Sequence, residues 1–169
     1  GPGFCGGGDL WLRGALRTGR EALGARWQAA YLSAPLWRFA LPGGVCGGGA
    51  VAGVLMPSVD RVGRQFPLTL AVEVPGAAAA ALMAATDWAP VEDLALAMLE
   101  DGAGRDRLVQ GLDALAVPAG LAGPPGGPTL WQAALAGRLT GFEAQGLPQG
   151  PAAVRLWDPA PAPAGEENP

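Results

Sequence analysis

The sequence of 169 residues contains no histidine, and each of its 11 basic residues is an arginine, so lysine is absent as well. Histidine is the general base of most serine and cysteine hydrolases and a common ligand of zinc and haem, while lysine forms Schiff bases and Walker-type phosphate sites. All of these sites would lack their central residue. An enzyme built from this chain would depend on carboxylates, arginine and a single tyrosine.

Cysteine and long apolar runs are also scarce. Two cysteines, Cys5 and Cys46, cannot form a disulfide framework or a four-cysteine metal site, so we expect free thiols. The longest alanine-rich run, residues 75–85, is too short to span a bilayer, and no signal-peptide pattern opens the chain. These features predict a soluble, cytoplasmic protein with no integral membrane segment, no metal and no cofactor.

Glycine and proline are abundant, with 28 and 17 residues, but half of the sequence is hydrophobic and only 15% is charged. A disordered polyelectrolyte has the opposite balance, and a chain of this length can bury a sizeable core. Most of the glycine and proline falls in connections and in the Pro/Ala-rich end of the chain. We therefore predict a single domain over residues 1–157 and a flexible tail over residues 158–169.

The net charge of −4 argues against a nucleic-acid-binding protein, but the charge is unevenly distributed. Residues 1–64 contain seven arginines against three carboxylates, whereas residues 65–169 contain four arginines against twelve carboxylates. This asymmetry could steer a partner protein. An ordinary solvated surface is the alternative interpretation.

A long amphipathic helix is predicted from Asp9, a favourable N-cap residue, to about residue 32. We expect its apolar face to pack on the core. That face consists of Leu12, Leu16, Leu23, Trp27 and Ala30. Beside it, Arg13, Arg17 and Arg20 form a basic ridge, which is a secondary candidate for contact with a partner.

Three short apolar runs predict an antiparallel meander of strands at residues 36–41, 51–56 and 66–74. Helical patterns follow from residue 77 to residue 100 and around residues 108–115. An edge strand at residues 129–134 and a last helical turn at residues 152–157 complete the expectation. The predicted fold class is α+β, with an antiparallel sheet flanked by helices.

The most polar connection between two predicted strands contains Ser58, Asp60, Arg61 and Arg64. We predict a partner-binding role there, because the serine has no base and arginines would keep a lone aspartate ionised. An internal pair between Asp60 and an arginine is the alternative. Trp37 and Arg38 are added to the candidate surface, because tryptophan and arginine dominate protein interfaces and neighbours on a strand point to opposite faces.

Several stretches together resemble the TagF family, also called ImpM, of proteins associated with type VI secretion. The resemblance covers most of the chain. The most specific stretches are Trp37-Arg38-Phe39 and Gly53-Val54-Leu55-Met56-Pro57-Ser58-Val59-Asp60-Arg61-Val62-Gly63-Arg64. The family pattern opens with Gly-aromatic-x-Gly-Lys-Leu-Pro and Gly-Asp-Phe, whereas residues 3–6 here lead almost directly into Asp9. The N-terminal segment is therefore expected to be shortened or incomplete.

The resemblance implies a cytoplasmic, non-catalytic accessory protein that restrains type VI secretion after translation. Its implied partner is the forkhead-associated scaffold protein of the same system, and some relatives are joined to a PP2C-type phosphatase. The family fold is similar to an α+β domain with an antiparallel sheet. Two alternatives stay open. One is a structural subunit of the secretion assembly, and the other is a small hydrolase that uses Ser58 and Asp60.

Overall fold

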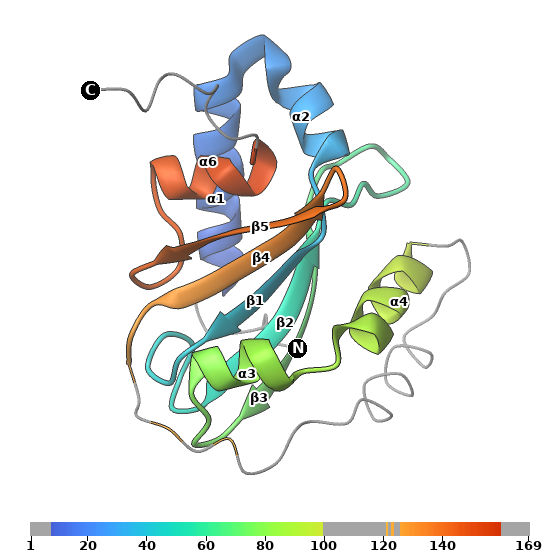
Figure 1. Ribbon diagram of the computed structural model, residues 1–169. Helices are drawn as coiled ribbons and strands as arrows, with labels where there is room; N and C mark the ends of the chain where they lie inside the picture. The colour runs from blue at the N-terminus through green and yellow to red at the C-terminus, as the bar shows by residue number, and fades with distance from the viewer. Residues whose placement is uncertain (1–7, 100–120, 122, 124–125, 160–169) are drawn as a thin grey trace.

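Five antiparallel strands form one sheet in the computed structural model, which describes residues 8–99, 121, 123 and 126–159 (Figure 1). The strand order is β3-β2-β1-β4-β5. The strands are β1 (Trp37–Leu41), β2 (Ala50–Met56), β3 (Leu68–Val74), β4 (Thr129–Leu135) and β5 (Arg138–Ala144). The predicted meander is confirmed as β1-β2-β3, and the α+β class is confirmed with it.

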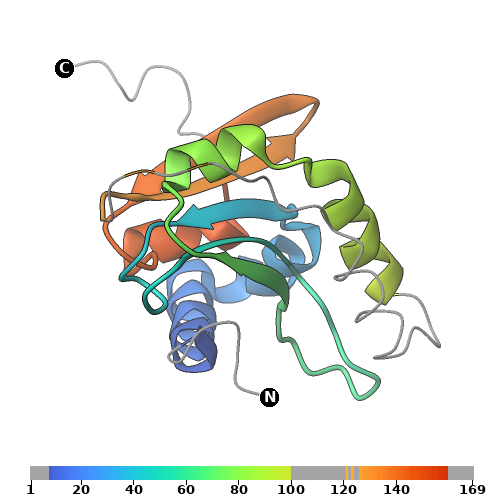
Figure 2. The same cartoon turned by 90° about the horizontal axis from the view of Figure 1, so that it is seen from below.

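Helices cover both faces of this sheet, as the view from below shows (Figure 2). One face carries α1 (Gly8–Leu23), α2 (Trp27–Ser33) and α6 (Pro151–Trp157), with a short 3-10 turn, η1 (Gly24–Arg26), between the first two. The other face carries α3 (Ala79–Ala85) and α4 (Trp88–Met98). Strand β2 is therefore buried along its whole length.

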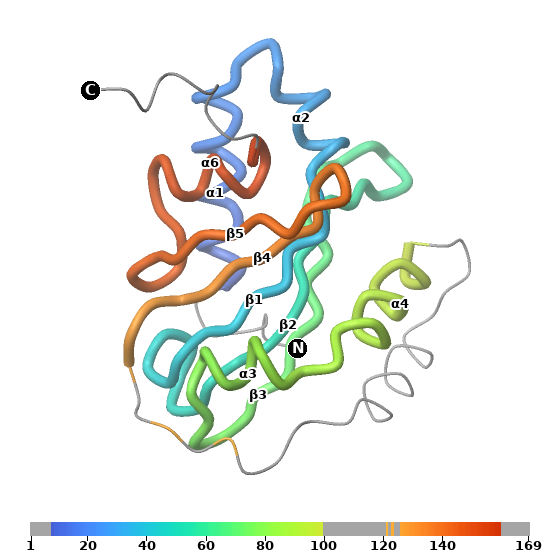
Figure 3. The backbone as a smooth tube through the Cα atoms, viewed as in Figure 1, coloured from blue at the N-terminus to red at the C-terminus, as the bar shows by residue number. Residues whose placement is uncertain are grey.

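Tryptophans fill the core on the α1 side. The indole N–H of Trp157 donates to the Ala15 carbonyl at 3.0 Å, and that of Trp37 donates to the Leu156 carbonyl at 2.9 Å. Because a buried indole N–H needs an acceptor, these bonds fix α6 against α1 and β1. Figure 3 shows α1 and α6, from opposite ends of the sequence, side by side. All six tryptophans of the sequence are buried.

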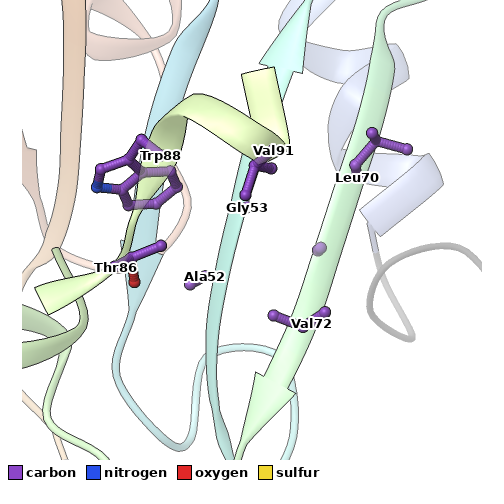
Figure 4. A pocket seen from close by; sticks show the side chains of 8 residues that line it. Ala52, Gly53, Leu70, Val72, Thr86, Trp88 and Val91 are labelled. Atoms are coloured by element: carbon purple, nitrogen blue, oxygen red, sulfur yellow. The ribbon is translucent and has the colours of Figure 1, made fainter. Parts of the chain in front are cut away.

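A small apolar cavity of about 20 Å³ lies in the other half of the core, between β2, β3 and the start of α4 (Figure 4). Carbon atoms line it, and the one hydroxyl nearby, that of Thr86, donates to the Leu82 carbonyl at 2.5 Å. Such a cavity is no larger than a single water and offers no polar partner. It carries no binding site.

The helix predicted over residues 9–32 is divided in two. Gly24 adopts a φ of +53°, a left-handed conformation that ends α1, and α2 starts three residues later. The apolar face is nevertheless as predicted, because Leu12, Leu16, Leu23 and Trp27 are all buried and Ala30 is partly buried against the same core.

The strand predicted at residues 129–134 exists as β4, but it is not an edge strand. It pairs with β1 on one side and with β5 on the other. Strand β5 was not predicted, because its side chains are mostly exposed and Gly141 interrupts its pattern. A two-residue turn, Ala136–Gly137, with φ of 52° and 78°, joins the two strands.

Four other expectations meet different outcomes. Cys46 is disulfide-bonded, so the expectation of a free thiol is wrong at this position, and Cys5 lies outside the described residues. The helix predicted around residues 108–115 and most of the tail predicted from residue 158 also lie outside them. No helix in the described part of the chain combines the length and the apolar character needed to cross a bilayer.

Candidate partner-binding site

The connection between β2 and β3, residues 57–67, is a structured loop that projects from the body of the molecule (Figure 2). A bridge between Val59 and Gln65 closes it, and the Phe66 amide donates to the Ser58 carbonyl at 3.2 Å. At the tip, Gly63 adopts a φ of +85° and its amide donates to the Asp60 carbonyl at 3.0 Å. The loop thus extends the hairpin of the two strands.

The carboxylate of Asp60 organises the tip. It accepts hydrogen bonds from the amides of Val62 at 3.0 Å and Arg64 at 2.8 Å, and from Nε of Arg64 at 2.7 Å. These bonds, led by the one from the Arg64 amide, hold the pKa of Asp60 below its usual value. The internal pair that the sequence left as an alternative is therefore present, and it uses Arg64.

Two aromatic residues of α2 anchor the base of the loop. The buried hydroxyl of Tyr31 donates to the Ser58 carbonyl at 2.7 Å and accepts from the Ser58 amide at 3.0 Å. The indole N–H of Trp27 donates to Oε1 of Gln65 at 2.9 Å. Gln65 in turn donates from Nε2 to Oε1 of Gln28 at 2.7 Å. Both legs of the loop are thereby fixed to the helix.

Large apolar side chains are exposed around this anchored loop. The described residues contain eight exposed large hydrophobic side chains, and six of them lie on the loop, at the end of α2 or at the end of α4. We name these six the apolar cluster. Its members are Leu32, Val59, Val62, Phe66, Leu96 and Leu99.

An open groove of about 330 Å³ joins the three segments of the apolar cluster. Leu32 of α2, Val59 of the loop, and Met98 and Leu99 at the end of α4 contribute to its walls, together with residues 57 and 58. Leu32, Val59 and Leu99 are the members of the apolar cluster that line this groove, and exposed apolar side chains gathered in this way are typical of interaction sites in proteins.

Arg61 is the remaining charged residue of the loop. It is exposed, and none of the ion pairs among the described residues involves it. The four predicted residues Ser58, Asp60, Arg61 and Arg64 therefore have distinct places. The backbone of Ser58 is the point at which Tyr31 anchors the loop, and the bonds between Asp60 and Arg64 fix its tip. Arg61 is exposed and takes part in none of these bonds.

Trp37 and Arg38 are not part of this site. Trp37 is only 1% exposed and packs edge-on against Phe142, so the prediction that it belongs to a binding surface is wrong. Arg38 points to the opposite face, where Nε lies 2.5 Å from Oε1 of Glu92 and the guanidinium lies over the Trp88 ring. The error arises because helices cover both faces of β1, so that Trp37 is fully buried and Arg38 is only partly exposed and already paired with Glu92.

The predicted basic ridge is present on α1. Arg13, Arg17 and Arg20 are exposed, and none of them takes part in an ion pair within the part of the chain that the structure describes. The guanidinium of Arg20 lies 5.6 Å from the centre of the Trp27 ring. The ridge belongs to another helix and adds no residue to the loop.

Sequence reasoning missed the residues that hold and surround the loop, above all Tyr31, Gln65 and Leu99. The available signal was the single tyrosine of the chain, which lies in a helix with Trp27 four residues before it. Helical spacing places these two aromatic residues on one face, but it does not indicate which segment they contact.

A sequence profile of the TagF N-terminal domain, described as type VI secretion system-associated, matches residues 4–115. The chain belongs to the TagF family. The matched residues of this TagF chain include α1 to α4, the meander, the loop at residues 57–67 and every member of the apolar cluster. The family assignment gives the chain an accessory role associated with type VI secretion.

The similarity extends beyond the matched domain. The crystal structure of PA0076 from Pseudomonas aeruginosa PAO1 is similar over 91% of this TagF chain and 84% of that chain, with 33% sequence identity and a TM-score of 0.72. Among curated proteins, none matches the chain at a significant level.

Proposed function

We propose that this TagF chain is a non-catalytic, cytoplasmic accessory protein that negatively regulates type VI secretion after translation. It acts by binding the forkhead-associated scaffold protein of the same secretion system. The observation that carries this proposal is the loop at residues 57–67, which is anchored at both legs and contributes three of the six members of the apolar cluster.

The anchoring supports a binding role through preorganisation. A loop that is already ordered loses little conformational entropy when a partner binds, so more of the contact energy appears as affinity. Tyr31 and Gln65 supply that order here. Arg61 can then present a planar, multidentate donor to a carboxylate or carbonyl of the partner, which is a frequent role of arginine in interfaces.

The same geometry supports the proposal that the loop is not catalytic. A general base needs a pKa near the working pH and must lie within hydrogen-bond reach of the group it deprotonates. Asp60 is the nearest carboxylate in sequence to Ser58, its pKa is lowered, and its oxygens are engaged by Val62 and Arg64. The backbone of Ser58, in turn, is bonded to Tyr31.

Isothermal titration calorimetry of the purified chain with the purified scaffold protein tests the proposal. Val62→Asp places a charge in the apolar cluster, and we expect it to weaken binding by at least about tenfold. Arg61→Lys should also weaken binding, because lysine cannot reproduce the bidentate fork. Both side chains are exposed, so the melting temperature should change little.

Leu10→Asp is the matched control, since Leu10 is 76% exposed on α1 and lies outside the apolar cluster. Its affinity for the scaffold should equal that of the unmodified chain. Absence of binding by the unmodified chain, or equal losses in all three variants, would contradict the proposal. Stable association with the contractile sheath, and none with the scaffold, would instead favour a structural subunit. A purified PP2C-type phosphatase is the second partner to titrate.

A further inference from the structure

Strand β5 ends the sheet on the side opposite to β3 (Figure 1). It pairs with β4 over residues 138–144, and no other backbone hydrogen bond joins these residues to another described segment. The outward edge of β5 is therefore a row of amide and carbonyl groups without a protein partner among the described residues. Such an edge is a template for another strand.

The hairpin turn determines which groups face outward. In a hairpin with a two-residue loop, the flanking residues Leu135 and Arg138 form a hydrogen-bonded pair, and such pairs recur at every second position. Arg138 and every second residue after it therefore bond to β4. The amides and carbonyls of Leu139, Gly141 and Glu143 point away from the sheet.

The two edges of the sheet differ in their protection. Pro67 and Pro75 flank β3, which also carries the exposed Glu73. Proline and charge at a sheet edge are devices that prevent further strand pairing. Strand β5 also carries charged residues, Arg138 and Glu143, but it contains no proline, and its register with β4 runs through seven consecutive pairs without a bulge. Its edge is open to pairing.

We propose that β5 is a homotypic docking edge, at which a second copy of this chain pairs its own β5 in the antiparallel sense about Gly141. In this two-fold register Leu139 lies opposite Glu143 of the second copy, and Gly141 lies opposite itself. All three outward residues of each copy then form hydrogen-bonded pairs. No two like charges lie directly opposite each other, because Arg138 faces Ala144.

The side chains next to the edge can accommodate a second copy of the chain. Leu139 is 62% exposed and lies on the α3 side of the sheet, with Gly141 and Glu143. An open cleft of about 540 Å³ extends there between β5 and α3, with Met83 and Leu130 in its walls. In the proposed register Leu139 of the second copy is the diagonal neighbour of Gly141. Because Gly141 has no side chain, this leucine can extend into the cleft, and by symmetry Leu139 of the first copy extends into the cleft of the second.

Gly141 is required for the close approach of β4 and β5. A Cβ atom at this position would lie 2.5 Å from the Trp131 carbonyl oxygen. The hairpin itself therefore requires glycine at the centre of the edge, and the proposed pairing uses this position without a side chain. Contacts restricted to one strand and one cleft give a small interface, so a weak, concentration-dependent dimer is expected.

Sedimentation velocity of the purified chain, at concentrations from about 1 to 300 µM, tests for this weak association. We expect a reversible monomer–dimer equilibrium in this range. A chain that is monomeric at every concentration would overturn the proposal, whether or not another protein binds the same edge. The outcome does not depend on binding of the scaffold, which is assigned to a different part of the molecule.

Charge substitutions at Leu139 test the register itself. Leu139→Asp places a carboxylate opposite Glu143 and should weaken the dimer at least about tenfold, whereas Leu139→Lys should tighten it about threefold through two symmetric ion pairs. The double variant Leu139→Asp/Glu143→Lys should restore dimerisation. Leu10→Asp, at a comparably exposed leucine of α1, should leave it unchanged.

Two results in this series would overturn the proposal even if the chain dimerises. The first is a dimer that Leu139→Asp does not weaken. The second is an equal loss with Asp and Lys at position 139, because the two charges must differ when Glu143 lies opposite. Circular dichroism melting curves identify any variant that loses the dimer because it unfolds. If Leu139→Asp is such a variant, the proposal is tested by whether Leu139→Lys tightens the dimer.

Discussion

The hydroxyl of Tyr31 forms two hydrogen bonds to the backbone of Ser58, one as a donor at 2.7 Å and one as an acceptor at 3.0 Å. The amide N–H and the carbonyl oxygen of Ser58 are thus both paired with one side chain, which comes from α2. The base of the loop at residues 57–67 therefore depends on a residue that lies 27 positions earlier in the sequence.

Tyr31→Phe should destabilise the fold by about 1–3 kcal/mol, because the Ser58 amide and carbonyl lose their partner. The free energy of unfolding, measured by urea titration at neutral pH, checks this value. Binding to the scaffold should weaken as well, since the loop loses one of its two anchors. An unchanged stability would show that water replaces the hydroxyl without cost.

The pH dependence of stability should report on the same hydroxyl. Burial raises the pKa of Tyr31 above its ordinary value of 10.0. The folded state therefore binds the proton more tightly, so this stabilisation is complete below pH 10.0 and is lost as the pH rises through the folded-state pKa. The chain has no lysine and no second tyrosine, so the alkaline loss should be much smaller in Tyr31→Phe.

Asp60→Ala should loosen the tip of the loop and leave the core intact, because the Asp60 carboxylate is exposed and its bonds are local. Hydrogen exchange of the Val62 and Arg64 amides should become faster, while exchange in β2 stays unchanged. In the unmodified chain the same amides should lose protection as the pH falls through the lowered pKa of Asp60. Uniform acceleration across the sheet would instead indicate a global role.

Two glycines of α1 form a matched pair for testing the packing of the helices. A Cβ atom at Gly19 would lie 2.5 Å from the rings of Trp27 and Trp157, whereas a Cβ atom at Gly14 meets nothing within 4 Å. Gly19→Ala should therefore destabilise the protein by about 1–3 kcal/mol. Gly14→Ala should stabilise it by up to about 1 kcal/mol. Thermal melting of both variants measures the difference, and equal shifts would contradict this packing.

Trp27→Ala should destabilise the whole fold by about 3–5 kcal/mol, because it removes a buried ring and the donor to Gln65. The melting temperature should fall, and scaffold binding per folded molecule should fall too. Trp27→Phe retains most of the ring but not the N–H, so it separates packing from anchoring. An unchanged melting temperature for the Ala variant would exclude Trp27 from the core.

The sequence was sufficient for the meander because apolar runs with short polar connections leave few alternatives to β1, β2 and β3. It also placed Asp60 and Arg64 in one connection, where their pairing is local. It could not assign Trp37 to the core, because that requires knowing that α6 covers its face. Nor could it pair Tyr31 with Ser58, since helical periodicity shows which side of α2 is apolar and not which segment lies against it.

Strand β1 lies between β2 and β4 in space, although 87 residues separate the end of β1 from the start of β4 in the sequence. The region that matches the TagF profile ends at residue 115, before β4 begins. A fragment cut at that boundary would leave one side of β1 unpaired and would lack the α6 cover of α1. During synthesis, likewise, β1 has no partner on its β4 side until residues 129–135 have emerged from the ribosome, so the N-terminal part presents an unpaired strand edge during that interval.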